Sequence, residues 1–125
     1  MLSSSRAHNT IAMDEYIDPL KALADPHRLR VFWLLAHIDE RICVAEAMEV
    51  LGVSHYNASR HLSQLKKAGL VKARREGKHV FYTLNHEGGE FIDTLLAATR
   101  AIPPRGFQCE ISRCKNLLSL RQVAK

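Results

Sequence analysis

A three-residue break between two short helical patterns constrains this chain more than any other feature of its sequence. Residues 42–51 and 54–68 both carry apolar side chains at helical spacing. Gly52 is placed to end the first helix and Ser54 to begin the second, because glycine and serine are preferred at those two helix ends. The inner face of the second helix would hold Ala58, Leu62 and Leu65. The sequence therefore predicts a helix-turn-helix motif.

Two segments of alternating apolar and polar residues follow this motif. They cover residues 70–75 and 79–84, and Glu-Gly-Lys at 76–78 joins them. The alternation predicts a β-hairpin with one exposed face. The expected fold class is mainly α with a β-hairpin wing, that is, a winged helix-turn-helix.

Three further helices are predicted around this unit. The first covers residues 14–24 and is kinked at Pro19 or starts near it. The second starts at Asp25-Pro26, where a capping acceptor precedes a proline, and runs to about His37. The fifth covers residues 87–102, and its apolar stripe is wider than a monomer of this size needs, which indicates a homodimer contact.

The chain of 125 residues is expected to hold one folded domain over residues 13–102, with a flexible tail at 1–12 and a cysteine-bearing tail at 103–125. A short helix is expected within the second tail. No apolar run reaches the roughly 20 residues of a membrane helix, and residues 1–12 lack the apolar stretch of a signal peptide. We expect a cytoplasmic protein without a membrane partner. Reduced cysteines are expected, because three is an odd number and nothing indicates export.

Basic residues are concentrated in the motif and hairpin. Residues 54–79 contain seven Lys and Arg against Glu76 alone, whereas residues 1–50 contain five basic and eight acidic residues. Such a basic surface suits a polyanion, because Lys and Arg displace the counterions condensed on DNA. A merely solvated charged face remains the alternative that charge alone does not exclude.

The second helix of the motif has the side chains that a DNA-reading helix needs in its first two turns. Asparagine can pair with adenine and arginine with guanine, and serine hydroxyls can contact phosphate. Basic residues of the hairpin would reach phosphate or an adjacent minor groove. The candidate contacts to double-stranded operator DNA are Ser54, His55, Tyr56, Asn57, Ser59, Arg60, Gln64, Arg74, Arg75, Lys78 and His79.

Several segments resemble the ArsR/SmtB family of winged-helix metalloregulators. Residues 24–30 (Ala-Asp-Pro-His-Arg-Leu-Arg) resemble the opening of that family's second helix. Residues 59–62, 68–71 and 74–82 are similar to its recognition helix and wing, in the same order and spacing. The resemblance covers about residues 14–100. It implies a homodimer, built on the first and fifth helices, that binds a palindromic operator and releases it when an effector binds.

The three cysteines are the candidate effector site. Cys43 is expected at the start of the third helix, whose partial positive charge favours a thiolate. Its position resembles the first cysteine of the Cys-Val-Cys motif in arsenic-responsive members of the family, but Ala45 stands where the second cysteine would be. Further ligands must therefore come from elsewhere, and Cys109 and Cys114 are available. These two converge only if a helix begins after Cys109, because five helical positions separate side chains by about 140°.

The resulting hypothesis is a site of three thiolates from Cys43, Cys109 and Cys114, within one subunit or across the dimer. Thiolates select thiophilic ions. Arsenic(III) or antimony(III) would suit three sulfurs without a fourth ligand, and cadmium and lead are further candidates. Two alternatives stay open: the cysteines are small buried apolar residues, or the protein is a thiol-based redox or sulfide-responsive repressor in which Cys109 and Cys114 form a disulfide or polysulfide.

Other functional classes have less support in the sequence. The chain has no Cys-x-x-Cys, glycine-rich phosphate loop or nucleophile–base pair, so we do not expect an enzyme. The seven histidines form no pair at metal-ligand spacing, and His27 and His37 are interpreted as surface or helix-end residues. A winged helix used only for protein contacts is the remaining alternative.

Overall fold

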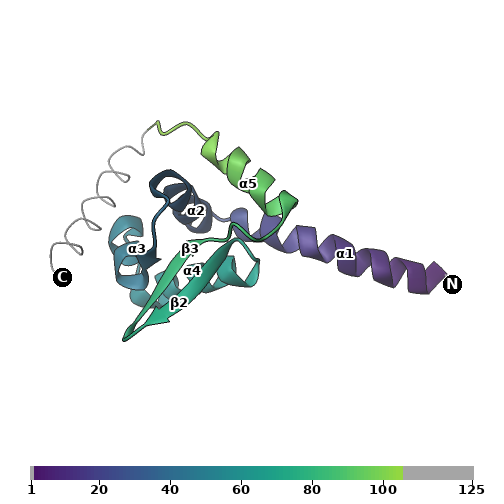
Figure 1. Ribbon diagram of the computed structural model, residues 1–125, viewed down its shortest axis with the longest axis horizontal. Coiled ribbons are helices and arrows are strands. Elements are labelled where there is room, and N and C mark those ends of the chain that lie inside the picture. The colour runs from purple at the N-terminus through teal and green to yellow at the C-terminus, as the bar shows by residue number, and fades with distance from the viewer. Residues whose placement is uncertain (1, 106–125) are drawn as a thin grey trace.

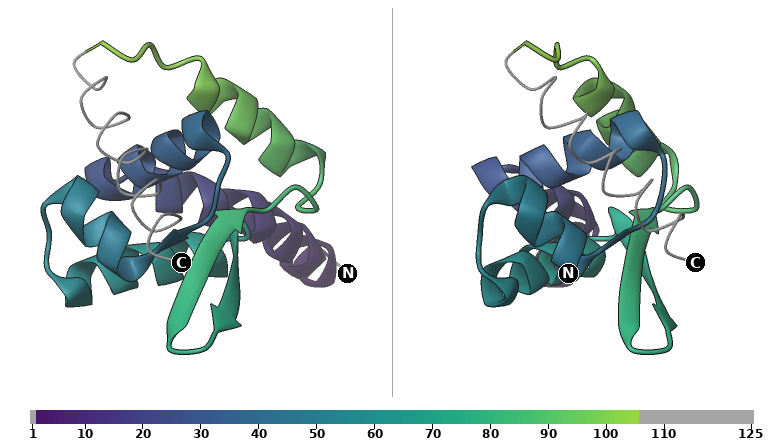
Figure 2. Two further views of the ribbon diagram at one scale, coloured as in Figure 1. Left: turned by 60° about the vertical axis from the view of Figure 1, so that its left-hand side comes forward. Right: turned by 90° about the vertical axis from the view of Figure 1, so that its left-hand side faces the viewer.

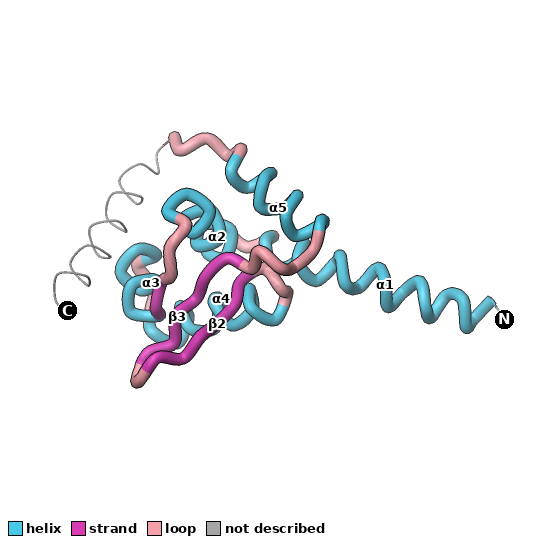
Figure 3. The backbone as a smooth tube through the Cα atoms, in the orientation of Figure 1, coloured by secondary structure: helices cyan, strands magenta, loops and turns pink. Residues whose placement is uncertain are grey.

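The computed structural model describes the backbone of residues 2–105 and the side chains of residues 13–105. Five helices and three strands occur in this part of the chain (Figure 3). In order along the chain these elements are α1 (Leu2–Leu23), α2 (Pro26–Ile38), β1 (Ile42–Cys43), α3 (Val44–Leu51), α4 (His55–Lys67), β2 (Val71–Glu76), β3 (His79–Leu84) and α5 (Glu90–Arg100). The predicted mainly helical fold with one β-hairpin is confirmed.

Helix α2 is the centre of the hydrophobic core. The Asp25 carboxylate caps its N-terminus by accepting hydrogen bonds from the backbone N–H groups of His27 and Arg28, both at 3.0 Å. Residues 31–36 are all buried, which is more than one face of a helix. Leu29, just before this segment, is half-buried. A helix buried on several sides is covered by neighbours, and α2 indeed contacts α1, α3, α4, α5 and β3.

The sheet has three antiparallel strands in the order β1-β3-β2. The β2–β3 hairpin has the predicted position, and its register pairs Val71 with Leu84 and Glu76 with His79. The prediction of a helix from residue 42 is wrong by two residues, because Ile42 and Cys43 form strand β1 and pair with β3. Pairing with a distant strand overrides the local helical pattern here, and α3 begins only at Val44.

Helix α1 is longer than predicted. It begins at Leu2 and includes residues 2–12, for which the sequence predicted a separate tail. It also continues through Pro19, which is fully buried, so the helix does not start near that proline. Burial of the proline ring stabilises the helix at this residue. It offsets the loss of the backbone hydrogen bond that proline cannot donate.

Helix α5 begins three residues later than predicted. The Asn85 side chain accepts a hydrogen bond from the backbone N–H of Glu87 at 3.0 Å, which forms a turn, and Gly89 follows with a φ of 97° that favours glycine. The other end of the helix is fixed to α2. Trp33 Nε1 donates to the Ile102 carbonyl oxygen at 3.0 Å, and Arg100 Nε donates to that of Ala36 at 3.3 Å.

The two elements that extend furthest from the core are α1 and the hairpin. The N-terminal end of α1 reaches away from the other helices (Figure 1). In both views of Figure 2 the β2–β3 hairpin also projects from the helices. Among the described helices, none combines the length and apolar character that crossing a membrane requires. The predicted helix within residues 103–125 lies outside the described residues.

Candidate nucleic-acid interface

The turn between α3 and α4 is built by the two residues that the sequence indicated. Gly52 has a φ of 69° and donates its backbone N–H to the Met48 carbonyl oxygen at 2.8 Å, which ends α3. Ser54 caps α4, because its Oγ accepts a hydrogen bond from the Asn57 backbone N–H at 3.2 Å. These two caps fix where α4 starts, and therefore which of its residues face outward.

The predicted outward face of α4 is largely exposed. Ala58, Leu62 and Leu65 are fully buried and attach the opposite face to the core, as predicted. Tyr56 is 73% exposed, more than any other large hydrophobic side chain among residues 13–105. Of the candidate contacts on this helix, those that are exposed are Ser54, His55, Tyr56, Arg60 and Gln64, and those that are half-buried are Asn57 and Ser59.

The hairpin presents its cations to solvent. The side chain of Arg74 is 85% exposed, and Gly77 turns the chain with a φ of 63°. The remaining candidate contacts of the hairpin are also exposed, namely Arg75, Lys78 and His79. Strand β2 contacts α4, so the exposed helix face and the hairpin belong to one structural unit.

Two ion pairs join the hairpin to residues outside it, and local sequence patterns predicted neither of them. Arg41 pairs with Glu76, and its guanidinium carbon lies 4.1 Å from the centre of the Phe81 ring. Lys72 pairs with Glu87, and this contact, together with the charge of Lys72, lowers the pKa of the Glu87 carboxyl below its ordinary value. The partners are 35 and 15 residues apart, so no local spacing indicates these pairs.

His61 is the one polar side chain on the inner face of α4. It is only 5% exposed, and burial lowers the pKa of its imidazole in spite of the nearby Asp25. Burial by itself would raise the pKa of Asp25, but hydrogen bonds from backbone N–H groups and the charge of Arg28 lower it. The sequence contained a signal for this burial, because His61 lies three residues after Ala58 and four before Leu65.

Cys43 lies where β1 passes into α3. Its backbone N–H donates to Glu46 Oε1 at 2.9 Å, so a glutamate in the first turn caps the chain at this residue. The thiol is buried, and burial raises its pKa, as does the charge of Glu46. The expectation that the helix terminus favours a thiolate at Cys43 is therefore wrong for this structure. Desolvation of the anion outweighs the partial charge of a helix of eight residues.

The structure brings none of the predicted thiol ligands together within its described part. Cys109 and Cys114 lie outside the described residues. Among the side chains of residues 13–105, the only group of three or more histidine, cysteine or acidic side chains able to share an ion consists of Asp25, His27 and His61. Cys43 does not belong to this group, and the other two cysteines both lie in residues 106–125.

The fold and the exposed face define a winged helix-turn-helix protein. A family model described as a helix-turn-helix domain matches residues 23–74. A homodimeric winged helix-turn-helix DNA-binding domain from Mycobacterium bovis, described as a possible ArsR-family transcriptional regulator, has a similar structure. The TM-score is 0.62 at 32% identity, over 74% of this chain and 82% of that one.

Two relatives from Pseudomonas putida extend this comparison to sequence. The arsenic resistance transcriptional regulator ArsR2 is 35% identical over 100 residues, which is 80% of this chain and 86% of the relative. The regulator ArsR1 is 39% identical over 87 residues, or 67% of each chain. The protein belongs to the ArsR family of transcriptional regulators. The predictions of this family, of the winged fold and of a regulator that is not an enzyme are confirmed.

Proposed function

We propose that this protein is a homodimeric repressor that binds a palindromic operator and releases it when its cysteines bind a thiophilic ion. The proposal of DNA binding rests on one observation, the exposed polar face of α4 beside an exposed cationic hairpin. A helix held by its opposite face can enter a major groove without any rearrangement of its core. A cytoplasmic location is part of this proposal.

In the proposed complex, the first two turns of α4 read base edges. Arg60 is exposed and can form paired hydrogen bonds with guanine, and Asn57 can do so with adenine. The Ser54 hydroxyl accepts a hydrogen bond within the helix cap, so its own O–H remains able to donate to a phosphate. His55, Tyr56, Ser59 and Gln64 complete the proposed helix contacts. On the hairpin, Arg74, Arg75, Lys78 and His79 would contact phosphates.

An exposed apolar stripe on α1 supports the proposed dimer. Met13 is 56% exposed, Tyr16 44% and Leu20 49%, and their spacing of three and four residues places them on one side of the helix. Tyr16 also contacts Phe91 of α5, with ring centres 5.0 Å apart, so the stripe continues toward α5. A second copy that covers this stripe would place two α4 helices on one duplex, which matches a palindromic operator.

For the effector we propose arsenic(III) or antimony(III), bound by Cys43, Cys109 and Cys114, with cadmium and lead as further inducers. Relatives of the chain include two arsenic resistance regulators and a cadmium resistance regulatory protein homolog from Staphylococcus aureus. Three sulfurs satisfy a pyramidal arsenic(III) ion. If the ion binds the free dimer more tightly than the DNA-bound dimer, it must weaken operator affinity by the same factor.

A redox or sulfide response is the second candidate. The raised pKa of the buried Cys43 makes it a poor nucleophile, so in this case the cysteines of residues 103–125 would react first. HlyU from Vibrio cholerae, whose structure was solved in a reduced form, is similar to this chain with a TM-score of 0.60 and 27% identity. HlyU from Vibrio cholerae is described as a transcriptional activator, so repression by the present chain is part of the proposal.

A single titration series tests the function and separates the two effectors. An operator is first selected from a random duplex library, and binding is followed by fluorescence anisotropy. We expect affinity to fall steeply with salt, as for a dimer held by several phosphates. Arsenite should then release the duplex from the reduced protein, whereas hydrogen peroxide or a polysulfide should not.

Single Cys→Ser variants serve as matched controls in this titration. Each of Cys43→Ser, Cys109→Ser and Cys114→Ser should bind the operator as the wild type does but respond less to arsenite. A normal arsenite response in all three variants would refute the thiol site. Release by the oxidant alone would establish the redox alternative, and the absence of any duplex preference would refute operator binding itself.

A further inference from the structure

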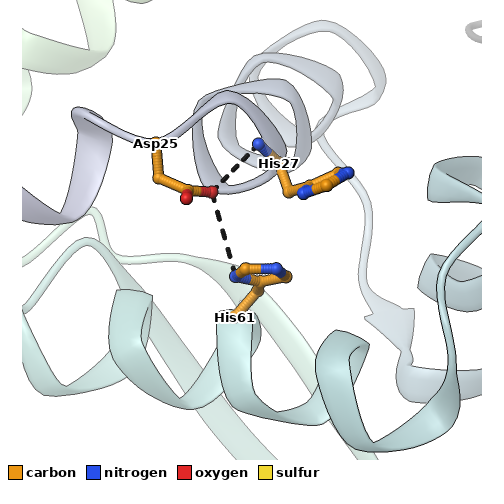
Figure 4. A group of neighbouring side chains, drawn as sticks. All are labelled: Asp25, His27 and His61. Carbon is orange, nitrogen blue, oxygen red and sulfur yellow. Dashed lines mark hydrogen bonds and ion pairs between the residues drawn. The ribbon is translucent and has the colours of Figure 1, made fainter.

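Three potential metal ligands meet where the N-terminus of α2 packs on the inner face of α4 (Figure 4). They are Asp25, the capping residue of α2, His27 in the first turn of α2, and His61 of α4. One ligand atom of each lies within 4.8 Å of the other two. Asp25 Oδ2 and His61 Nδ1 are 3.9 Å apart, and the two imidazole ring centres are separated by 5.3 Å.

The state of His61 indicates that this group is more than a helix cap. Its side chain is 6% exposed, yet its buried Nδ1 atom makes no hydrogen bond within the described part of the chain. A buried polar nitrogen without a partner costs roughly 1–3 kcal/mol, so such atoms are uncommon in native proteins. Figure 4 shows this nitrogen directed toward the carboxylate of Asp25. A ligand bound between the three side chains would satisfy it.

The capping role of Asp25 leaves room for such a ligand. Its Oδ2 atom accepts both backbone hydrogen bonds of the cap. An ionised carboxylate has about four lone-pair sites, so two of them stay available. His27 is half-buried at the edge of the group, which gives an ion a path from solvent and a position for a water ligand.

We propose that Asp25, His27 and His61 form a binding site for a divalent transition-metal ion of the zinc class. Two imidazole nitrogens and one carboxylate oxygen are ligands that Zn²⁺ shares with Co²⁺ and Ni²⁺. Bonds of about 2.0–2.2 Å place tetrahedral ligand atoms roughly 3.3 Å apart, so distances within the group must shorten by at most about 1.5 Å. This site is separate from the three cysteines and uses no sulfur.

Nearby cations limit how tightly the site can bind. The charges of Arg28 and Arg60 both act on His61, and Asp25 is the only anion in the group. The Arg28 side chain is held partly away from the three ligands, because its Nε donates to the Ala22 carbonyl oxygen at 2.7 Å. We therefore expect an exchangeable ion with an affinity below that of a structural four-ligand zinc site.

Because the proposed metal site joins α2 to α4, a bound ion should also affect DNA binding. Only this expected effect on DNA binding rests on the proposed function. An ion shared by α2 and α4 would fix the inner face of the helix whose outer face carries Arg60. Fixing that helix before it meets DNA lowers the ordering cost of binding. Zinc-class ions should then strengthen operator binding, the opposite of the effect proposed for arsenite.

The experiment uses the full-length, untagged protein with all three cysteines changed to serine, so that sulfur cannot bind the probe. Co²⁺ is titrated in the absence of DNA, and visible d–d absorption reports its coordination. We expect one Co²⁺ per protomer, displaced by Zn²⁺, with a higher midpoint of thermal unfolding when the ion is bound. No sulfur-to-cobalt charge-transfer band should appear.

Two variants and one matched control assign the ligands. His27→Ala removes a ligand at the edge of the site, and Asp25→Ser removes the carboxylate while keeping a residue that can cap α2. Each should weaken Co²⁺ binding by about tenfold or more. His86→Ala removes an exposed histidine elsewhere and should leave binding unchanged. Circular dichroism verifies that each variant is folded.

Several outcomes would overturn the proposed metal site. They are the absence of Co²⁺ uptake by the cysteine-free protein, uptake that both ligand variants retain, and equal loss of uptake in His86→Ala. These results do not affect the operator assay, because that assay is run without added Co²⁺ or Zn²⁺. Conversely, failure of operator binding would remove the predicted effect on DNA but not the Co²⁺ signal.

Discussion

Helix α4 and the start of helix α3 are neighbours in the fold, but their functional candidates have opposite relations to solvent. Arg60 and Gln64 of α4 are exposed, whereas Cys43 is 8% exposed and has a raised thiol pKa. The proposed DNA-binding surface is thus already formed in the described conformation. The proposed effector must displace packed side chains to reach Cys43, and we propose that this displacement changes the position of α4.

The largest expected effect is on the free energy of unfolding, and it should differ between the buried and the exposed face of α4. Leu62→Ala should lower the free energy of unfolding by about 2–5 kcal/mol, because Leu62 is fully buried in the core. Gln64→Ala, on the exposed face of the same helix, should change it by less than about 0.5 kcal/mol. Urea unfolding followed by circular dichroism measures both. Similar costs for the two variants would mean that α4 does not have one buried and one exposed face.

The next effect concerns DNA affinity. Arg60→Ala should weaken binding to the selected operator by about 1–3 kcal/mol, or roughly 5- to 150-fold, and should relax the preference for one guanine. Stability should hardly change, because the side chain is exposed. Anisotropy with the operator and with single-base variants measures the loss. An unchanged affinity would remove Arg60 from the interface.

The hairpin should contribute in a different way from the helix. Lys78→Ala should weaken binding to all duplex sequences alike and reduce the slope of log affinity against log salt by about 1, because Lys78 is proposed to contact a phosphate. Anisotropy at a series of salt concentrations gives the slope. A loss confined to one sequence would instead indicate that the hairpin reads bases.

The smallest effect comes from the Lys72–Glu87 pair. The pKa of Glu87 is lowered from its ordinary 4.5, so the pair stabilises the folded protein above that pH and loses its contribution as pH falls through the lowered pKa. Because both side chains are exposed, the effect is small. Thermal unfolding of wild type and Glu87→Gln should differ slightly near neutral pH and converge in acid. A difference that persists in acid would contradict this pairing.

Local signals in the sequence were sufficient to predict helix α4. Gly52, Ser54 and the spacing of Ala58, Leu62 and Leu65 predicted where α4 begins and which face it buries, because caps and periodicity depend on residues close in the chain. The hairpin was predicted for the same reason. The outward residues of α4 followed from these two inferences and not from any separate signal.

Features that depend on distant residues were not predicted. Strand β1 exists because Ile42 and Cys43 pair with β3, and nothing in residues 42–51 alone indicates that pairing. The meeting of Asp25 and His27 with His61 joins positions more than 30 residues apart, so a search for local histidine spacing could not find it. The raised pKa of Cys43 likewise follows from burial, which a helix-terminus argument leaves out.

The central claim is that α4 and the β2–β3 hairpin form the surface that binds DNA. Titration of the selected operator into isotope-labelled protein, followed by amide chemical shifts in NMR spectra, tests it most directly. We expect the largest shifts in residues 54–64 and 74–79, with α5 little affected. Shifts concentrated in α1 and α5, with residues 54–64 unchanged, would contradict it.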